Sequence, residues 1–166
     1  MIVVMAGLPG TGKSTLARKL AVRLGGVVVS KDEIREAAFG EFVDYSSGQD
    51  DLCMEFVYQV ARYVKAPVVI DGRTYTKKRQ VDRLVEVLGE VRMIECVCDE
   101  AIVKDRLERD RAHVARNRDY AMYVEMKKTA EKIEMPRLTV DTQNADALSL
   151  AVEYILGPRM DTDGHR

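Results

Sequence analysis

The sequence predicts an α/β fold built on one parallel sheet, and two observations carry that prediction. Apolar runs of four to seven residues alternate with longer segments in which apolar residues recur at helical spacing. The apolar runs are continuous and do not alternate with polar residues, as expected for strands that are buried on both faces of a sheet. Helices are therefore expected to cover both faces.

Five apolar runs predict the strands. They span residues 2–6, 27–30, 68–71, 92–98 and 137–141.

Six helices are expected between and after these strands. The first carries Leu16, Leu20 and Leu24 on one face and is stopped by Gly25 and Gly26. The second ends before Pro67, and the third has Gly89 at its C-terminal cap. Each of these two helices is expected to bury an apolar stripe, formed by Leu52, Phe56, Val60 and Val64 in the second and by Val81, Leu84, Val85 and Leu88 in the third.

The last three helices are predicted from their caps and breakers. Asp99 is a candidate N-cap for the fourth helix, which carries Val103 on its apolar face. The fifth helix is expected to run from about residue 120 until Pro136 breaks it. The sixth is expected to run from about residue 146 to residue 156 and to close at Gly157 in the left-handed conformation.

Length and composition predict one globular domain. The chain has 166 residues, and we place the domain at residues 1–158, with the polar residues 159–166 as a flexible tail. A composition of 46% hydrophobic and 32% charged residues excludes the disordered and collagen-like classes. The apolar run at residues 2–6 is too short for a signal peptide or a membrane span, so we expect a cytoplasmic protein without a membrane partner. The three cysteines are expected to be free thiols.

The motif GLPGTGKS predicts a phosphate-binding loop between the first strand and the first helix. Glycines let the backbone turn tightly and aim its N–H groups at phosphate oxygens, and the helix N-terminus adds a favourable dipole. Lys13 reaches the β- and γ-phosphates, and the Ser14 hydroxyl is a ligand for Mg²⁺. The expected nucleotide-binding residues of this loop are Gly7, Gly10, Thr11, Gly12, Lys13, Ser14 and Thr15.

The segments GLPGTGKSTLA and VVVSKDEIR, together with the chain length, resemble the small P-loop kinases. This group includes polynucleotide 5′-hydroxyl kinases, gluconate-type sugar-acid kinases and the zeta-toxin group. The resemblance covers nearly the whole chain in the order of its elements, and the first loop is its most specific part. It implies a three-layer P-loop NTPase fold, with a five-stranded parallel sheet, helices on both faces and an arginine-bearing lid at about residues 109–119. It also implies a phosphotransferase that uses ATP and Mg²⁺ and an alcohol group as acceptor.

The segment SKDEIR follows the second predicted strand and matches the pattern of the polynucleotide-kinase branch. The resemblance implies that Asp32 is the general base and that Arg35 positions the acceptor. Transfer to an alcohol requires a carboxylate that takes the hydroxyl proton, and the end of a strand would hold it rigidly. The alternative is a helix start with Ser30 or Asp32 as N-cap and a solvated Arg35.

Asp71 ends the third predicted strand, at the edge of a parallel sheet where ligands bind. In this Walker-B-like position Asp71 can orient Mg²⁺ through water or hold the acceptor. Arg73 and Thr74 would then line the acceptor side. The alternative is a plain Asp-Gly turn.

A charged segment after the fourth strand predicts the lid. Residues 104–119 contain six basic and four acidic residues. The resemblance implies that a lid arginine binds phosphate and neutralises charge on the transferred group. Arg109 is our first candidate, Arg111 and Arg116 are its rivals, and His113 is interpreted as a lid residue without a catalytic role.

The segment after the fifth strand is where the resemblance implies contact with adenine. Thr142 is the main candidate, with Asp141 and Gln143 beside it. A plain loop in which Asp or Thr caps the next helix is the alternative. The sequence contains no Asn-Lys-x-Asp run that would indicate guanine.

Charge favours a small acceptor. The formal net charge of −1 gives no overall attraction to nucleic acid, and Glu41 and Asp44 would repel a polyanion beside the expected acceptor site. We therefore predict a small-molecule or nucleoside-type acceptor. One alternative is a 5′-hydroxyl polynucleotide kinase, and another is an ATP-binding regulatory protein with little transfer. The sequence leaves the oligomeric state open.

Overall fold

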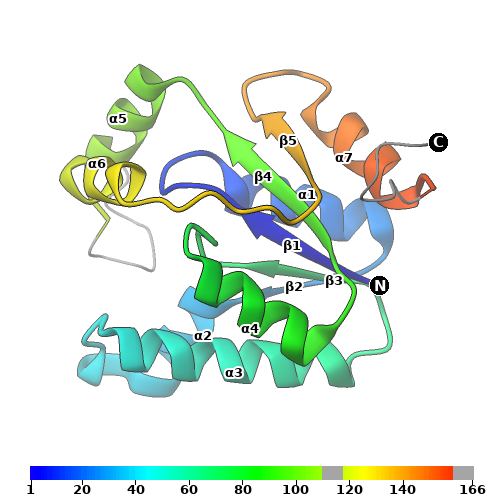
Figure 1. Ribbon diagram of the computed structural model, residues 1–166, viewed down its shortest axis with the longest axis horizontal. Helices are drawn as coiled ribbons and strands as arrows, with labels where there is room; N and C mark the ends of the chain where they lie inside the picture. Colours follow the sequence, from blue (N-terminus) through cyan, green and yellow to red (C-terminus); the bar gives the residue numbers. More distant parts are fainter. Residues whose placement is uncertain (110–117, 159–166) are drawn as a thin grey trace.

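The computed structural model of the chain describes residues 1–109 and 118–158, and within them one parallel sheet holds five strands (Figure 1). The strand order is β2-β3-β1-β4-β5, with every neighbouring pair parallel. This confirms the predicted fold class, and β4 ends one residue before the expected position. The strands are β1 (Ile2–Ala6), β2 (Val27–Ser30), β3 (Val68–Asp71), β4 (Arg92–Val97) and β5 (Arg137–Asp141).

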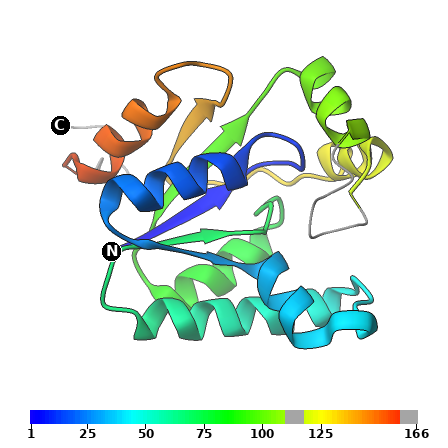
Figure 2. The same ribbon diagram turned by 180° about the vertical axis from the view of Figure 1, so that it is seen from behind.

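Helices cover both faces of the sheet, as predicted. Figure 2 shows α1 (Lys13–Leu24) and α7 (Ala147–Leu156) over one face, and Figure 1 shows α3 (Ser47–Tyr63) and α4 (Lys78–Leu88) on the other. Each face has its own apolar core, because buried strand residues point alternately to the two sides. Leu20 of α1 and Leu84 of α4 are fully buried, one in each core.

The remaining helices lie toward the carboxyl ends of the strands (Figure 1). α2 (Lys31–Phe39) directly follows β2 and leads into the short 3-10 helix η1 (Gly40–Phe42). α5 (Glu100–Arg109) follows β4, and α6 (Tyr120–Lys128) packs beside it through the buried side chains of Leu107 and Tyr123. These helices enclose the edge of the sheet at which parallel-sheet proteins bind ligands.

The predicted buried face of α3 is wrong. Leu52, Phe56 and Val60 are 48%, 51% and 39% exposed, and Val64, just after the helix, is partly buried. The buried side of α3 instead carries Cys53, Met54, Val57, Tyr58 and Ala61. Because α3 has apolar residues on two adjacent faces, periodicity alone did not decide which face meets the sheet.

Three further expectations about helices need correction. α2 was expected only as an alternative, and the structure forms it, with Ser30 as the N-cap. α6 ends at Lys128, well before Pro136, because Glu131 turns back to α4 and accepts a hydrogen bond from the Lys78 N–H (2.6 Å). Gly157 has φ −72° and ψ 167°, so α7 does not close in the left-handed conformation.

Other predicted caps and the cysteines agree with the structure. Gly25 and Gly89 follow α1 and α4 with positive φ. Asp99 accepts a hydrogen bond from the N–H of Ala101 in the first turn of α5 (2.8 Å). The three cysteines are free, and Cys98 is half-buried while the other two are buried.

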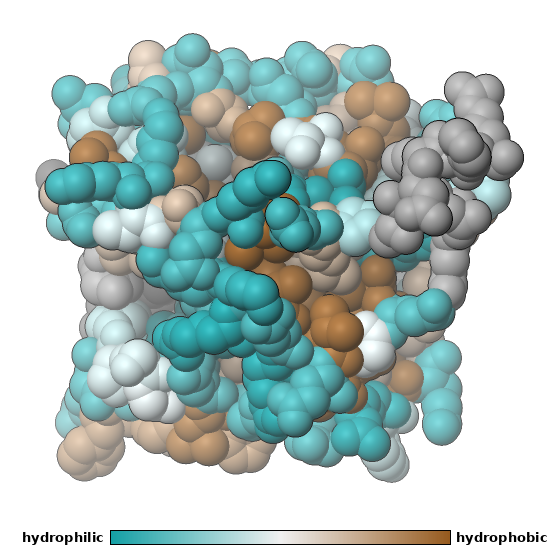
Figure 3. Space-filling view, in the orientation of Figure 1, coloured by the Kyte–Doolittle hydropathy of each residue, from teal (hydrophilic) through white to brown (hydrophobic). Residues whose placement is uncertain are grey.

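The surface seen in Figure 3 is mostly hydrophilic and is broken by smaller apolar patches. In residues 1–109 and 118–158, none of the helices has the length and apolarity that crossing a membrane requires. Residues 159–166, expected to form a tail, lie outside the described residues.

Candidate active site

A cavity of about 990 Å³ lies at the carboxyl edge of the sheet. Its walls come from the turn after β1, the first turns of α2 and α3, the segment after β3, α5 and the segment after β5. The register of the sheet explains part of this convergence, because Ser30 at the end of β2 lies beside Asp71 at the end of β3. Side chains that follow these two strands therefore face the same space.

The P-loop, residues 7–14, forms the floor of this cavity. Gly7 has φ +122°, and a Cβ built there would lie 2.3 Å from the carbonyl oxygen of Cys96, so this turn requires glycine. The Gly7 N–H donates to the carbonyl of Thr74 (3.0 Å), which ties the loop to the segment after β3. α1 begins at Lys13, so the N-terminal end of this helix faces the cavity.

Lys13 is buried and folds back over the loop. Its ammonium donates to the carbonyl oxygen of Leu8 (2.7 Å). Burial lowers the pKa of Lys13 to about 8, although the nearby Asp71 carboxylate opposes this shift. Because burial has removed water from this ammonium, a negatively charged phosphate that enters the cavity would take the place of that water and stabilise the protonated form.

Asp32 lies in the first turn of α2, not at the end of β2 as expected. The side chain of Ser30 accepts a hydrogen bond from the Glu33 N–H (3.4 Å) and caps the helix, so Asp32 is free of that task. The carboxylate of Asp32 lies 3.5 Å from the Lys31 ammonium and 3.4 Å from the Arg35 guanidinium. It lines the cavity and is in reach of a bound ligand.

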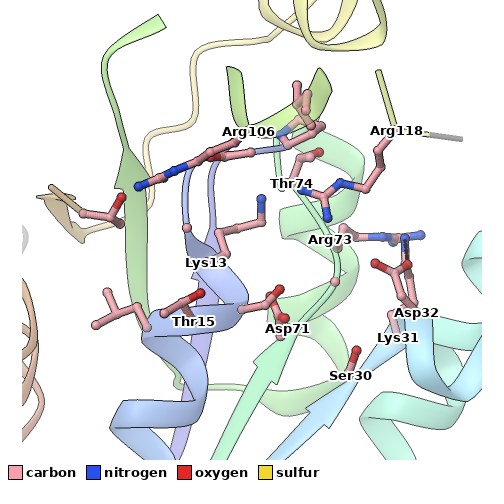
Figure 4. A pocket seen from close by; sticks show the side chains of 18 of the residues that line it. Lys13, Thr15, Ser30, Lys31, Asp32, Asp71, Arg73, Thr74, Arg106 and Arg118 are labelled. Carbon is pink, nitrogen blue, oxygen red and sulfur yellow. Dashed lines mark hydrogen bonds and ion pairs between the residues drawn. The ribbon is translucent and has the colours of Figure 1, made fainter. Parts of the chain in front are cut away.

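Asp71 ends β3 and is 4% exposed. Its Oδ1 is buried and has no hydrogen-bond partner among the described residues. Figure 4 shows the Asp71 carboxylate below Lys13 in the same cavity. A buried carboxylate oxygen without a partner needs a polar ligand, and a hydrated Mg²⁺ ion would supply one. Asp71, with Ser14 in the wall of the same cavity, thus fits the predicted magnesium site.

Five charged residues form a cluster beside Asp71, which we call the ionic wall. Arg73 was predicted to line this side, and it is buried together with Lys31 and Arg35. Asp50, in the first turn of α3, accepts hydrogen bonds from all three cations. The ionic wall consists of Lys31, Asp32, Arg35, Asp50 and Arg73.

Sequence analysis missed Asp50. It sits in an ordinary acidic helix start, and its partners are 15 to 23 residues away in the sequence. One signal in the sequence could have pointed to it. Asp50 and Asp51 stand together at a helix start with no basic residue within one helical turn, so a partner for their charge has to come from elsewhere in the chain. Burial raises the pKa of Asp50, but Lys31 and Arg73 outweigh this effect and bring it down to about 2.

Two arginines of α5 line the cavity in different ways. Arg109, our first candidate, pairs with Asp105 (2.7 Å), and its side chain is 79% exposed, so its contact with phosphate stays a prediction. Arg106 donates to the carbonyl oxygen of Gly10 in the P-loop (3.2 Å). In Figure 4, Arg106 lies above Lys13 and Arg118 lies to its right, whereas Asp71 lies below Lys13. The rivals Arg111 and Arg116, and also His113, lie outside the described residues.

Thr142 lies against the P-loop. Its hydroxyl donates to the carbonyl oxygen of Thr11 (2.7 Å), so it supports the loop from the side of β5. Asn144 and Ala145 continue the cavity wall, while Thr15 is an exposed member of that wall in the first turn of α1. Contact of Thr142 with adenine stays a prediction.

Comparison with known proteins agrees with this architecture. A family model described as "AAA domain" matches residues 2–136. A shikimate kinase from Corynebacterium glutamicum is 52% identical over 40 residues, which are 24% of this chain and 24% of that protein. The chain thus aligns with only about a quarter of the length of this curated relative.

Two solved structures show the same fold over most of their length. A sugar kinase from Janibacter sp. HTCC2649 superposes with a TM-score of 0.72 at 15% identity, covering 93% of each chain. A gluconokinase from Sinorhizobium meliloti 1021 superposes with a TM-score of 0.67 at 18% identity, covering 90% of this chain and 87% of the other. The fold is that of the small P-loop kinases.

Proposed function

The chain belongs to the AAA domain family, and from the geometry of its cavity we propose that it is an ATP-dependent kinase acting on a hydroxyl group. One observation carries this proposal. The Lys13 ammonium of the P-loop and the Asp32 carboxylate of α2 line the same cavity, with Asp71 between the two elements at the end of β3. Phosphoryl transfer to an alcohol requires this pairing of a phosphate cradle with a base.

In the proposed reaction, the P-loop N–H groups and Lys13 bind the phosphates of ATP. The acceptor hydroxyl lies against Asp32, which takes its proton as the oxygen bonds to the γ-phosphorus. The bond between the γ-phosphorus and the oxygen that bridges to the β-phosphate breaks, and that oxygen leaves on ADP. Lys13 and an arginine, Arg106 or Arg118 by their position, stabilise the charge on the transferred group.

Ser14 and Asp71 would hold Mg²⁺. The ion supplies charge neutralisation at the β- and γ-phosphate oxygens when bound. The unpartnered Oδ1 of Asp71 supports this role. Among the described residues no group of three or more His, Cys, Asp or Glu side chains could hold a metal.

We propose a small polar acceptor. The ionic wall leaves Asp32 15% exposed at the cavity, and Glu41 and Asp44 lie on the exposed surface nearby, where a polyanion would be repelled. A 5′-hydroxyl end of nucleic acid is the alternative acceptor, and an ATP-binding regulatory role is the alternative of another class. The expected cytoplasmic location stays a prediction.

A screen for acceptor-dependent ADP release tests the proposal. Sugar acids, polyols, nucleosides and a 5′-hydroxyl oligonucleotide would each be added with ATP and Mg²⁺. Release that depends on a small hydroxyl compound is the expected result. Release with the oligonucleotide alone would establish the nucleic-acid alternative. ATP binding without release under any condition would favour the regulatory role and defeat the kinase proposal.

The variant Asp32→Asn tests the base. We expect turnover to fall by about 10²–10⁴-fold with ATP affinity unchanged, because the amide cannot take the proton. Glu41→Gln removes an exposed carboxylate outside the cavity wall and is the matched control. An Asp32→Asn enzyme with full activity would show that another group is the base.

A further inference from the structure

We propose that Asp50 is a positioning residue, which holds the ionic wall in the geometry that the base and the acceptor require. The inference rests on the proposed kinase function, because it assigns Asp50 a part in preparing that site. Asp50 belongs to α3, which follows α2 in the chain and lies farther from the P-loop motif in the sequence. It has no place in the proposed phosphoryl-transfer step itself.

The contacts of Asp50 link three separate segments. Its Oδ1 accepts hydrogen bonds from the Lys31 ammonium and from Nη2 of Arg35 (2.5 Å), both in α2. Its Oδ2 accepts from Nε of Arg73 (3.1 Å) and also from Nη2 of that residue, in the segment after β3. One carboxylate thus joins the start of α2, the start of α3 and the end of β3.

The two cations on Oδ1 are also the neighbours of the proposed base. Lys31 and Arg35 lie 3.5 Å and 3.4 Å from Asp32, and both are closer to Asp50. Asp50 therefore draws them away from Asp32. Without Asp50, both cations would turn fully to Asp32 and bind the carboxylate that must face the acceptor hydroxyl.

Burial makes this counter-ion necessary. The Lys31, Arg35 and Arg73 side chains are 9%, 5% and 4% exposed, so water solvates them too poorly to compensate for a lost carboxylate partner. The low pKa of Asp50 agrees with a carboxylate that the cations keep ionised. The Arg35 guanidinium also lies over the ring of Tyr45, 5.3 Å from its centroid.

Asp51 offers a matched control in the same helical turn. It pairs with Arg73 (2.6 Å) and Arg79 (3.2 Å), but its side chain is 47% exposed and it contacts neither cation beside Asp32. Removing the Asp51 carboxylate therefore changes the charge and a contact of Arg73, and it leaves the bridge to α2 in place. A difference between the two variants isolates that bridge.

The experiment compares Asp50→Ala with Asp51→Ala, with and without sodium formate, against sodium chloride at the same ionic strength. We expect Asp50→Ala to lower the melting temperature by about 10 °C and turnover by about tenfold to hundredfold, with ATP affinity unchanged. Formate, which fits the space of the lost carboxylate, should raise both the melting temperature and kcat of this variant. Asp51→Ala should lose less than twofold in kcat and should not respond to formate.

Several outcomes would overturn the proposal. One is a folded Asp50→Ala enzyme whose kcat and stability match those of Asp51→Ala with no response to formate, and another is an equal response of both variants. Should Asp50→Ala fail to fold, Asp50→Asn keeps the shape and removes the charge, and normal kcat in that variant would refute the role of the charge. Failure of the kinase proposal is separable, because a wild-type protein without acceptor-dependent turnover still allows formate to stabilise Asp50→Ala.

Discussion

The two sides of the cavity are built in different ways. The P-loop is a contiguous stretch of backbone, whose shape depends on glycine and which contributes one buried charged side chain, Lys13. The ionic wall is assembled from side chains of three separate segments and is held by ion pairs around Asp50. We therefore expect loss of the Lys13 charge to leave the fold stable, and loss of a charged side chain of the ionic wall to destabilise it.

Apart from loss of the proposed base, the largest effect on turnover is expected for Lys13→Met. Turnover should fall by about 10²–10³-fold, because the charge on the transferred group loses its main stabilising ammonium. The melting temperature should stay the same or rise, since the variant removes an ammonium whose pKa burial has lowered to about 8. Turnover and thermal unfolding measure the two effects.

Lys65→Met is the control for this prediction, since Lys65 is exposed and lies outside the cavity wall. It should leave turnover and stability as they are. A clear loss of stability in Lys13→Met would mean that Lys13 holds the fold together, and the contrast with the ionic wall would then fail.

Gly72→Ala should damage the ionic wall through the backbone. Gly72 has φ +102°, and an added Cβ would lie 2.9 Å from Cβ of Lys31 and 3.1 Å from its N. We expect a loss of about 3 kcal/mol in the free energy of unfolding, from strain and from this contact. Because Arg73 follows Gly72, the shift of the backbone should also displace the Arg73 side chain, and turnover should fall as well. Denaturant unfolding and turnover are the measurements.

Gly25→Ala separates backbone strain from crowding. Gly25 also has positive φ, +62°, but an added Cβ there would meet nothing within 4 Å. This variant should cost about 1 kcal/mol and leave turnover unchanged. Equal losses of unfolding free energy in Gly72→Ala and Gly25→Ala would show that the contact of the added Cβ with Lys31 does not destabilise the protein.

ATP affinity should depend on pH through Lys13. Protonated Lys13 attracts phosphate, and in the unliganded protein it loses its proton as the pH rises through about 8. Between pH 7 and pH 9 the affinity should therefore fall about tenfold, with proton uptake on binding above pH 8. Calorimetry in buffers of different ionisation enthalpy measures both quantities.

Lys13→Arg is the control for the pH dependence, because a guanidinium stays charged over this range. Its affinity, whatever the absolute value, should not change with pH in the same window. A wild-type protein with constant affinity from pH 7 to pH 9 would show that Lys13 keeps its proton despite burial.

Sequence reasoning succeeded where the signal was local. The strands are short continuous apolar runs, and β1, β2, β3 and β5 have the predicted bounds. The P-loop motif is contiguous, so its position and its turn into α1 could also be predicted. The position of Asp71 in the cavity wall could be predicted because this residue ends a recognisable strand.

The rest depended on tertiary packing. The apolar residues of α3 extend around more than one face, and only contact with the sheet selects the face with Val57 over the face with Phe56. The role of Asp50 depends on partners that the sheet register and α3 bring together across 15 to 23 residues. Ion pairs of this kind leave no repeated pattern in the sequence. The choice among the arginines after β4 depends on how α5 lies over the P-loop, which spacing alone does not reveal.

The smallest effects should distinguish the two arginines of α5. Arg106 donates to the carbonyl oxygen of Gly10 (3.2 Å), so Arg106→Ala should weaken ATP binding or lower turnover about fivefold through loss of one hydrogen bond and one nearby charge. Arg109 is 79% exposed and paired with Asp105, and Arg109→Ala should change either quantity by less than about twofold. Parallel ATP titrations and turnover assays compare the variants. A larger loss in Arg109→Ala would mean that Arg109 leaves Asp105 for the phosphates when ATP binds, and the sequence-based choice of this arginine would then be correct.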